Sequence, residues 1–526
     1  MANKMKTIFK RITLAFACVA CLSSCDDFLT TKPHDFLAPE TFYTTLNNCE
    51  MALSGVYSTL SREQFYGNHY ILELLVGNDL SYYQRGTATT NNKPCSNNYT
   101  ASSATLFTTW SALYTGINNA NLFLENIDGS EVEDDIKKRM KGEAKFLRAY
   151  YHWILVQGWY EVPLRKESFK DVNNSSLGAT SHAEALQWII DEMEACVDMV
   201  DDSDYDKTPS YIKKNTVMGI LARVYLWRAG YPCNGGNDDY AKAAYWANEV
   251  VKSQKHSLNP DYEDIWKKMC ADKYDPVNNE TIWEVEFYGN RNDGNETMGR
   301  LGNVIGNVNK GSQYGYGFAA PTLILYDLYE EGDQRREVSI CSYSVEANGT
   351  QKARNNISQR NCGKFRREWE DTHGFAGHKN YTGFNWPVLR YSDVLLMLAE
   401  AENEVNGPTD AAYNAINTVR ERAGIAPLSG LDQAAFRQEI RDERARELCF
   451  EAVRKFDLVR WGIYVKALTE DLAEAIKDTK RWSTGKDYME TPKSLATVTE
   501  EKHQFWPIPE NELSVNGELS QNSYWK

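Results

Sequence analysis

The side chains best suited to chemistry in this sequence are aromatic, amide and charged groups gathered in polar, glycine-rich stretches. Aromatic rings offer apolar surfaces, and the tyrosine ring adds a polar tip. Asn, Asp and Arg side chains supply hydrogen-bond partners for hydroxyl groups. Together these groups suit non-covalent binding of a sugar, which has apolar ring faces and many hydroxyls. The candidate ligand-binding residues are Asp79, Tyr82, Tyr83, Arg85, Tyr288, Arg291, Asn292, Tyr314, Tyr316, Trp369 and Tyr381.

These aromatic residues also have a purely structural interpretation. A ring in a loop can anchor that loop, and most of the 31 tyrosines are expected to pack between helices. The hypothesis is that the aromatic platform of a binding site lies within a smaller set. That set is Tyr82, Tyr83, Tyr288, Tyr314, Tyr316 and Trp369.

Sequence motifs for covalent or metal chemistry are absent. The chain has no phosphate-binding G-x-x-x-x-G-K-[ST], no H-E-x-x-H and no G-x-S-x-G. Among its 8 His, the closest pair, His373 and His378, is spaced poorly for a metal site. Glycoside hydrolysis needs two facing carboxylates, and no feature marks such a pair among the 73 Asp and Glu. We therefore expect a binding protein rather than an enzyme, with no cofactor and no metal.

The first 25 residues have the pattern of an export signal. Four basic residues precede an apolar stretch over 12–22, which is too short to span a bilayer. That stretch ends in Leu22-Ser23-Ser24-Cys25, which resembles a bacterial lipobox. We expect residues 1–24 to be removed as a signal peptide and Cys25 to be lipidated. The alternative is a simple cleaved signal followed by a chance cysteine.

The composition disfavours one class of partner, and it does not decide whether the cysteines form disulfides. The chain of 526 residues carries a formal net charge of −15, which disfavours nucleic acid because phosphate backbones are repelled. Eight scattered cysteines remain after Cys25, with no C-x-x-C pair. In an exported protein they could form disulfides or stay as buried thiols.

Apolar residues recur at three- and four-residue steps over much of the chain, which predicts amphipathic helices. The neighbouring helices suggest helix–turn–helix units of the tetratricopeptide type. Two stretches interrupt this pattern and are rich in Tyr, Asn and Gly, with one short strand predicted at 281–287. We expect a mainly α fold with a helical scaffold over about 40–254 and 388–526, and irregular ligand-binding insertions over about 61–104 and 255–387. The predicted helices span about 42–60, 106–127, 131–158, 181–200, 214–229, 239–254, 391–405, 409–423, 432–450 and 454–471.

Several segments, in the same order along the chain, resemble the SusD/RagB family. They run from just after the expected signal peptide to the last residues. They are CDDFLTTKP (25–33), residues 110–124, FLRAY (146–150) with EVPL (161–164), ARVYL (222–226), VLRYSDVLLMLAEA (388–401), VRERAG (419–424), RAREL (444–448) with RKFDLVRWG (454–462), and PIP (507–509) with QNSY (521–524).

The resemblance implies an α-rich fold with four tetratricopeptide-like helix pairs and an irregular ligand-binding lobe. It also implies a lipid-anchored protein on the outer face of the outer membrane, since Asp26 and Asp27 follow Cys25 as in such exported lipoproteins. The implied partner is a TonB-dependent barrel of the SusC type, to which an oligosaccharide is delivered. A peptide or glycopeptide ligand is the alternative, and a surface glycoside hydrolase is a third.

A cluster of charged residues near the C-terminus is expected to serve the scaffold. Arg444, Arg446, Glu447 and Arg454 stand at helical spacing and could pair with Glu443 and Glu451. We expect these residues to form structural ion pairs rather than a ligand site.

Overall fold

A computed structural model describes most of the chain. It covers residues 42–85, 89–90, 92–170, 176–201, 208–287, 299–371, 379–482 and 486–526. The expected signal peptide, Cys25, Tyr288, Arg291 and Asn292 lie outside the described residues. Among the helices described, none combines the length and the apolar character needed to cross a membrane.

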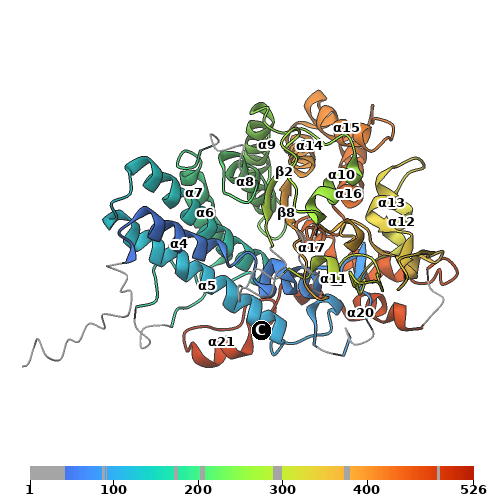
Figure 1. The fold of residues 1–526 in the computed structure, drawn as a ribbon, viewed down its shortest axis with the longest axis horizontal. Helices are drawn as coiled ribbons and strands as arrows, with labels where there is room; N and C mark the ends of the chain where they lie inside the picture. The colour runs from blue at the N-terminus through green and yellow to red at the C-terminus, as the bar shows by residue number, and fades with distance from the viewer. Residues whose placement is uncertain are drawn as a thin grey trace, which may run out of the picture.

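The fold is mainly helical, with 54% helix and 7% strand. Consecutive helices pack side by side from α4 to α9, and α14 continues this row against α9 although 138 residues separate the two. Figure 1 shows α4 to α9 in one half of the molecule, with α14 just beyond β2. The helices of the row are α4 (Leu46–Tyr57), α5 (Ala104–Asn126), α6 (Asp134–Trp159), α7 (His182–Cys196), α8 (Lys214–Ala229), α9 (Asn237–Lys252) and α14 (Tyr391–Asn406).

Local sequence signals explain where many of these helices begin. The hydroxyl of Thr45 accepts a hydrogen bond from the Asn48 backbone N–H at the start of α4, and Ser181 does the same for α7. Such caps satisfy backbone donors that the first helical turn leaves free. The predicted helices of the row therefore agree with the structure to within a few residues at most ends.

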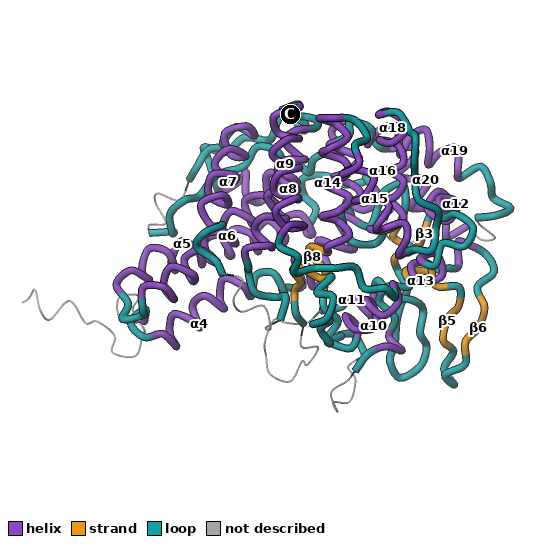
Figure 2. The backbone as a smooth tube through the Cα atoms, turned by 90° about the horizontal axis from the view of Figure 1, so that it is seen from above, coloured by secondary structure: helices purple, strands orange, loops and turns teal. Residues whose placement is uncertain are grey.

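The other half of the molecule combines helices with four two-stranded antiparallel sheets. The β2–β8 pair lies between the two halves (Figure 1), and the β5–β6 hairpin lies at one edge (Figure 2). The pairs are β1 (Ser81–Tyr83) with β3 (Ala319–Pro321), β2 (Thr281–Val285) with β8 (Trp386–Arg390), β4 (Ile340–Cys341) with β7 (Asn361–Cys362), and β5 (Tyr343–Val345) with β6 (Gln351–Ala353). The helices are α10 (Tyr262–Cys270), α11 (Leu301–Val304), α12 (Leu323–Leu328), α13 (Arg335–Ser339), α15 (Asp410–Arg422) and α16 (Gln433–Leu448).

The helix predicted over 454–471 is shorter and broken in the structure. Its first part, α17 (Arg454–Arg460), ends before Gly462, whose φ of +68° is a left-handed conformation that favours glycine. The remaining C-terminal helices are α18 (Tyr464–Lys466), the π-helical turn η8 (Ala467–Leu472), α19 (Ala473–Ala475), α20 (Glu490–Val498) and α21 (Glu510–Val515).

The C-terminal segment returns to the first helices and closes the fold. The backbone N–H of Trp506 donates to the carbonyl of Gly158 at 2.7 Å. The Trp506 ring lies so close to Gly158 that an added Cβ would stand 2.4 Å from it. Gly158 is therefore required for this contact, which joins chain segments about 350 residues apart.

The stretch over 61–104, expected to be an irregular ligand-binding insertion, is buried over much of its described length. It contains two π-helical turns, η1 (Glu63–Gly67) and η2 (His69–Leu75), as well as β1. Its polar side chains bond one another and the backbone: the Asn78 Oδ1 accepts from the N–H groups of Leu80 and Ser81 at 2.9 and 3.1 Å. Burial is tolerated because these polar groups are satisfied internally.

A buried set of ion pairs, here called the junction cluster, joins α13, β8 and the segment around Lys364 to α16 and the residues just after it. It consists of Arg335, Lys364, Arg390, Glu447 and Glu451. The Arg390 guanidinium contacts Glu447 Oε1 at 2.9 Å and Glu451 Oε1 at 2.7 Å, and Arg335 Nη1 contacts Glu447 Oε2 at 3.1 Å. Burial alone would raise the pKa of Glu447, but the surrounding arginines outweigh it and hold this pKa well below its usual value.

The expected scaffold ion pairs form, but mostly with other partners. Arg446 pairs with Glu443 as predicted, at 2.8 Å. Arg444 instead binds Asp393 and Asp457, and Arg454 binds Asp79. These partners come from other chain segments, which helical spacing alone does not reveal. Together the ion pairs fix the position of the irregular half against the helices.

Candidate functional site

A row of three half-buried aromatic rings, here called the aromatic ladder, lies on the extended segment 314–318. It consists of Tyr314, Tyr316 and Phe318. Side chains two residues apart on an extended chain point to the same side. The rings of Tyr316 and Phe318 are nearly parallel with centroids 5.1 Å apart, and Tyr314 stands at 74° to Tyr316 at 4.9 Å.

The glycines between these aromatic residues let the segment lie flat on the protein. A Cβ on Gly315 would stand 2.6 Å from the carbonyl oxygen of Asn307. A Cβ on Gly317, which has φ of +67°, would stand 2.7 Å from the Val308 side chain. The glycine side of the segment therefore packs on the Asn307 carbonyl and the Val308 side chain, and the aromatic side faces away from them.

Hydrogen bonds hold the ladder in place. The N–H groups of Tyr316 and Phe318 donate to the carbonyls of Asn303 and Val304 in α11, at 2.6 and 2.7 Å. The Asn303 side-chain amide donates to the carbonyls of Tyr314 and Lys379, at 3.1 and 3.0 Å. The ladder is thus held in one conformation. The protein therefore loses little conformational entropy when a ligand binds there.

A cation lies at each end of the ladder. The Arg85 guanidinium is 5.1 Å from the Phe318 ring centroid, and Lys379 Nζ is 4.8 Å from the Tyr314 centroid. Both side chains are exposed, and neither forms an ion pair with a residue that the structure describes. In the same described part of the chain, the hydroxyls of Tyr314 and Tyr316 find no hydrogen-bond partner. These groups are available to a ligand.

Two other predicted site residues lie near the ladder. Trp369 is half-buried with Arg366 4.6 Å from its ring, and the adjacent Arg367 donates to the Tyr314 carbonyl at 3.3 Å. Tyr381 is half-buried and precedes Thr382, which pairs with Gly299 just before α11. The structure therefore brings Arg85, Tyr314 and Tyr316 together, whereas Trp369 and Tyr381 are linked to the ladder only through neighbouring residues of their own segments.

Three predicted site residues are corrected by the structure. Tyr82 and Tyr83 are 0% and 2% exposed, with Tyr82 packed edge-on against Trp482. Asp79 is 4% exposed, and its two carboxylate oxygens accept from the Arg454 guanidinium at 3.0 and 2.7 Å. Buried side chains with these contacts cannot reach a ligand, so they belong to the scaffold.

Two residues of this region, Phe318 and Lys379, were not among the predicted site residues. Phe318 continues the alternation of aromatic residue and glycine that begins at Tyr314, so the pattern itself contained the signal. Lys379 reaches Tyr314 through the Asn303 bridge, which joins segments about 75 residues apart and leaves no local trace in the sequence.

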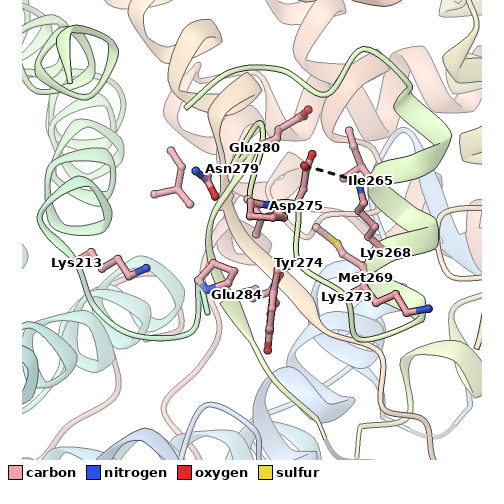
Figure 3. A pocket seen from close by; sticks show the side chains of 14 residues that line it. Lys213, Ile265, Lys268, Met269, Lys273, Tyr274, Asp275, Asn279, Glu280 and Glu284 are labelled. Carbon is pink, nitrogen blue, oxygen red and sulfur yellow. Dashed lines mark ion pairs between the residues drawn. The ribbon is translucent and has the colours of Figure 1, made fainter. Parts of the chain in front are cut away.

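A separate pocket lies between β2, α10 and residues 209–213 (Figure 3). Lys268 Nζ and Asp275 Oδ1 are 3.7 Å apart on its wall. Glu284 Oε1 accepts from the Asn385 amide at 2.8 Å, and burial, with a contribution from Glu286, raises the pKa of Glu284 to about 8. No cluster of three metal-ligating side chains is found among the described residues. This pocket offers paired charges rather than a free aromatic surface.

Comparison with known proteins gives consistent matches over the whole described fold. The family described as "SusD family" matches residues 341–525, and the one described as "Starch-binding associating with outer membrane" matches residues 27–226. The chain belongs to the SusD/RagB family. A SusD-like protein of Formosa agariphila is 28% identical, over 98% of this chain and 97% of that protein. The starch-binding protein SusD of Bacteroides thetaiotaomicron is 24% identical, over 78% and 77%.

Solved structures agree with this assignment. A SusD homolog from Bacteroides thetaiotaomicron superposes with a TM-score of 0.83 and 27% identity, over 92% of this chain and 98% of that one. A structure described as a laminarin-binding SusD-like protein has a TM-score of 0.72 at 22% identity, over 91% and 100%. SusD-family proteins are non-catalytic, and the chain is accordingly a binding protein and not an enzyme.

Proposed function

We propose that this SusD-family protein captures an oligosaccharide at the cell surface and delivers it to a TonB-dependent outer-membrane barrel of the SusC type. The observation that carries the proposal is the aromatic ladder, a fixed row of rings with free hydroxyls and cations. Similar proteins are described as starch-binding, laminarin-binding and surface glycan-binding. The ladder supplies groups of the kind that such ligands need.

The chemistry of the ladder fits a hydroxyl-rich chain. Ring carbons of Tyr314, Tyr316 and Phe318 can contact the apolar faces of sugar rings. Tyrosine hydroxyls can both donate to and accept from sugar hydroxyls, while Arg85 donates only. The two ring-to-ring steps of 4.9 and 5.1 Å make a continuous surface for a short oligosaccharide rather than a pocket for one small molecule.

The proposed location follows from the N-terminal segment. Residues 1–24 would direct export, and the acyl chains on Cys25 would hold the protein at the outer membrane. Several acyl chains give stable anchoring because each buried CH₂ contributes about 0.8 kcal/mol. Labelling cells with a radioactive fatty acid tests this directly: the wild type is expected to incorporate label, and Cys25→Ser is expected not to.

The capture role is tested with the chain from Asp26 to Lys526, which contains every described residue. Native affinity gels with a panel of polysaccharides, mucins and peptides would screen for retardation, and titration calorimetry would measure any hit. Micromolar to millimolar affinity for a glycan, with no product released, is the expected result. Binding to peptides alone would replace the glycan with a peptide or glycopeptide ligand, and turnover of a polysaccharide would contradict the capture role.

Delivery to a barrel requires a second experiment. Affinity-tagged, full-length protein purified in mild detergent from its own cells is expected to bring down an outer-membrane barrel of the TonB-dependent class. A preparation that retains glycan binding but contains no barrel would contradict this part of the proposal alone.

A further inference from the structure

The two cations that flank the aromatic ladder differ from most others in the described structure. Arg85 and Lys379 are exposed, lie over aromatic rings and have no carboxylate partner among the described residues. They stand at opposite ends of the row, one beside Phe318 and the other beside Tyr314. A ligand that follows the ladder would therefore meet a positive charge at each end.

The carboxylates on neighbouring segments are already occupied. Glu63 pairs with Arg300 at 3.2 Å, and Glu370 pairs with Arg367 at 2.9 Å. Glu346 pairs with Lys310 at 3.0 Å. Glu368 accepts hydrogen bonds from the Tyr343 hydroxyl at 2.7 Å and the Asn307 amide at 3.3 Å. Glu368 keeps its charge because these two partners are neutral. Arg85 and Lys379 together outnumber it, so the described surroundings of the ladder keep a small local excess of positive charge.

This local excess contrasts with the whole chain, whose formal net charge is −15. An acidic body repels an anionic ligand at long range, although salt screens that repulsion beyond about 8–10 Å. A neutral glycan needs no unpaired cations at its site. A ligand with carboxylate or sulfate groups is stabilised by such cations, because Arg and Lys form shorter and stronger hydrogen bonds with ionised acceptors.

We propose that the ligand of the aromatic ladder is an acidic oligosaccharide, whose carboxylate or sulfate groups pair with Arg85 and Lys379. This inference rests on the proposed glycan-binding function and specifies its substrate class. The rings and tyrosine hydroxyls contact the sugar skeleton, and the cations select its charged substituents. Because both cations are exposed, the selection weakens as ionic strength rises.

The test compares acidic glycans with neutral forms of the same chains. Titration calorimetry of the Asp26–Lys526 chain would use polygalacturonate, alginate, chondroitin sulfate and heparin fragments, together with their carboxyl-reduced or desulfated counterparts. Neutral laminarin, galactan and starch fragments complete the set. At least one acidic fragment is expected to bind tenfold or more tightly than its neutralised form at low salt, and this ratio is expected to shrink at 0.5 M salt.

Three variants assign the selectivity to residues. Arg85→Gln/Lys379→Gln is expected to bind the acidic and the neutralised fragment within about twofold of each other. Lys252→Gln, an exposed lysine on α9, is the matched control and is expected to keep the wild-type ratio. Tyr314→Ala/Tyr316→Ala is expected to lose both fragments.

The outcomes separate this inference from the function on which it rests. Equal or tighter binding of neutral glycans by the wild type, or an unchanged ratio in Arg85→Gln/Lys379→Gln, would overturn the acidic substrate class and leave glycan capture intact. No binding to any glycan, or unchanged binding by Tyr314→Ala/Tyr316→Ala, would overturn the proposed glycan function at the ladder itself.

Discussion

The junction cluster and the aromatic ladder use the same kinds of residue in opposite ways. In the junction, Lys364 and Arg390 lie 4.4 and 5.3 Å from the Trp266 ring, are buried, and bind carboxylates. At the ladder, Arg85 and Lys379 lie at similar distances from their rings but are exposed and lack carboxylate partners in the described chain. Cation and ring together therefore do not mark a binding site, and what distinguishes the ladder is that its cations are exposed and lack carboxylate partners among the described residues.

The physical reason is the cost of removing charge from water. A buried charge needs both an opposite charge and hydrogen bonds, and its removal leaves the partner charge buried alone. An exposed charge remains hydrated, so it can stay unpaired until a ligand arrives. Variants of the two regions should consequently have different effects. Junction variants should lower the stability of the fold, and ladder variants should weaken ligand binding.

The largest expected effect is loss of a junction cation. Arg390→Met would leave Glu447 and Glu451 with fewer partners in a buried site. The free energy of unfolding is expected to fall by about 3–5 kcal/mol, as measured by urea denaturation followed with tryptophan fluorescence. Arg437→Met, which breaks a partly exposed pair with Glu404, is the control and is expected to cost less than about 1 kcal/mol. Equal losses in the two variants would contradict the distinction.

Ladder variants are expected to show the reverse pattern. Tyr314→Ala/Tyr316→Ala removes two half-buried rings that are proposed to contact the ligand, so affinity is expected to fall about 30-fold or more, or about 2 kcal/mol. The unfolding midpoint should change little because both rings are partly exposed. Tyr245→Ala, at an exposed position on α9, provides the control for removing a surface ring. A binding loss accompanied by an equally large stability loss would mean that the ladder is scaffold.

Lys455 combines features of both regions, since it is buried like the junction but contacts no carboxylate in the part of the chain that the structure describes. Its ammonium donates to the His503 carbonyl at 2.9 Å, and burial lowers its pKa to about 7. Between pH 7 and 10.5 the unfolded chain binds more protons, so this group makes stability rise with pH in that window. Lys455→Met is expected to gain about 1–2 kcal/mol at pH 7.

Urea denaturation of Lys455→Met at pH 7 and at pH 10 checks the sign. The gain over wild type should shrink as the pH rises toward 10.5, because the wild-type lysine is then neutral in the folded state and increasingly neutral in the unfolded state. A variant that is less stable than wild type at pH 7 would show that the contacts of Lys455 outweigh its desolvation.

The smallest expected effect concerns Glu284 in the pocket of Figure 3. Its pKa is raised to about 8 by burial, so between pH 4.5 and 8 the folded state binds more protons than the unfolded state. This contribution to stability is present below pH 4.5 and is lost as the pH rises through 8. Glu284→Gln keeps an acceptor for the Asn385 amide and is expected to flatten this fall in stability. Thermal unfolding scans from pH 5 to 8 measure this pH dependence of stability. Glu474→Gln, at a surface position, is the control.

Much of the fold could be predicted from the sequence, because helical periodicity and capping residues are local signals. The row of helices was predicted from these local signals. Thr45 and Ser181 cap the N-termini of α4 and α7 in the structure. The break after α17 shows the limit of periodicity, since the apolar pattern continues past Gly462 while the backbone does not.

The site was harder to predict, because exposure depends on contacts between distant segments. Asp79 and Arg85 are six residues apart in a similar polar stretch, yet Asp79 is buried against Arg454 and Arg85 is exposed. No local pattern distinguishes them. Tyr314 and Tyr316 were identifiable because glycines alternate with them, which leaves one side of the segment for aromatic rings.

The most direct test of the account is the structure of the protein in complex with the tightest-binding oligosaccharide from the panel. We predict sugar rings against Tyr314 and Tyr316, with ligand oxygens within hydrogen-bond distance of Arg85 or Lys379. A ligand bound elsewhere, for example in the pocket beside Glu284, with the ladder bare, would contradict the assignment of the binding site.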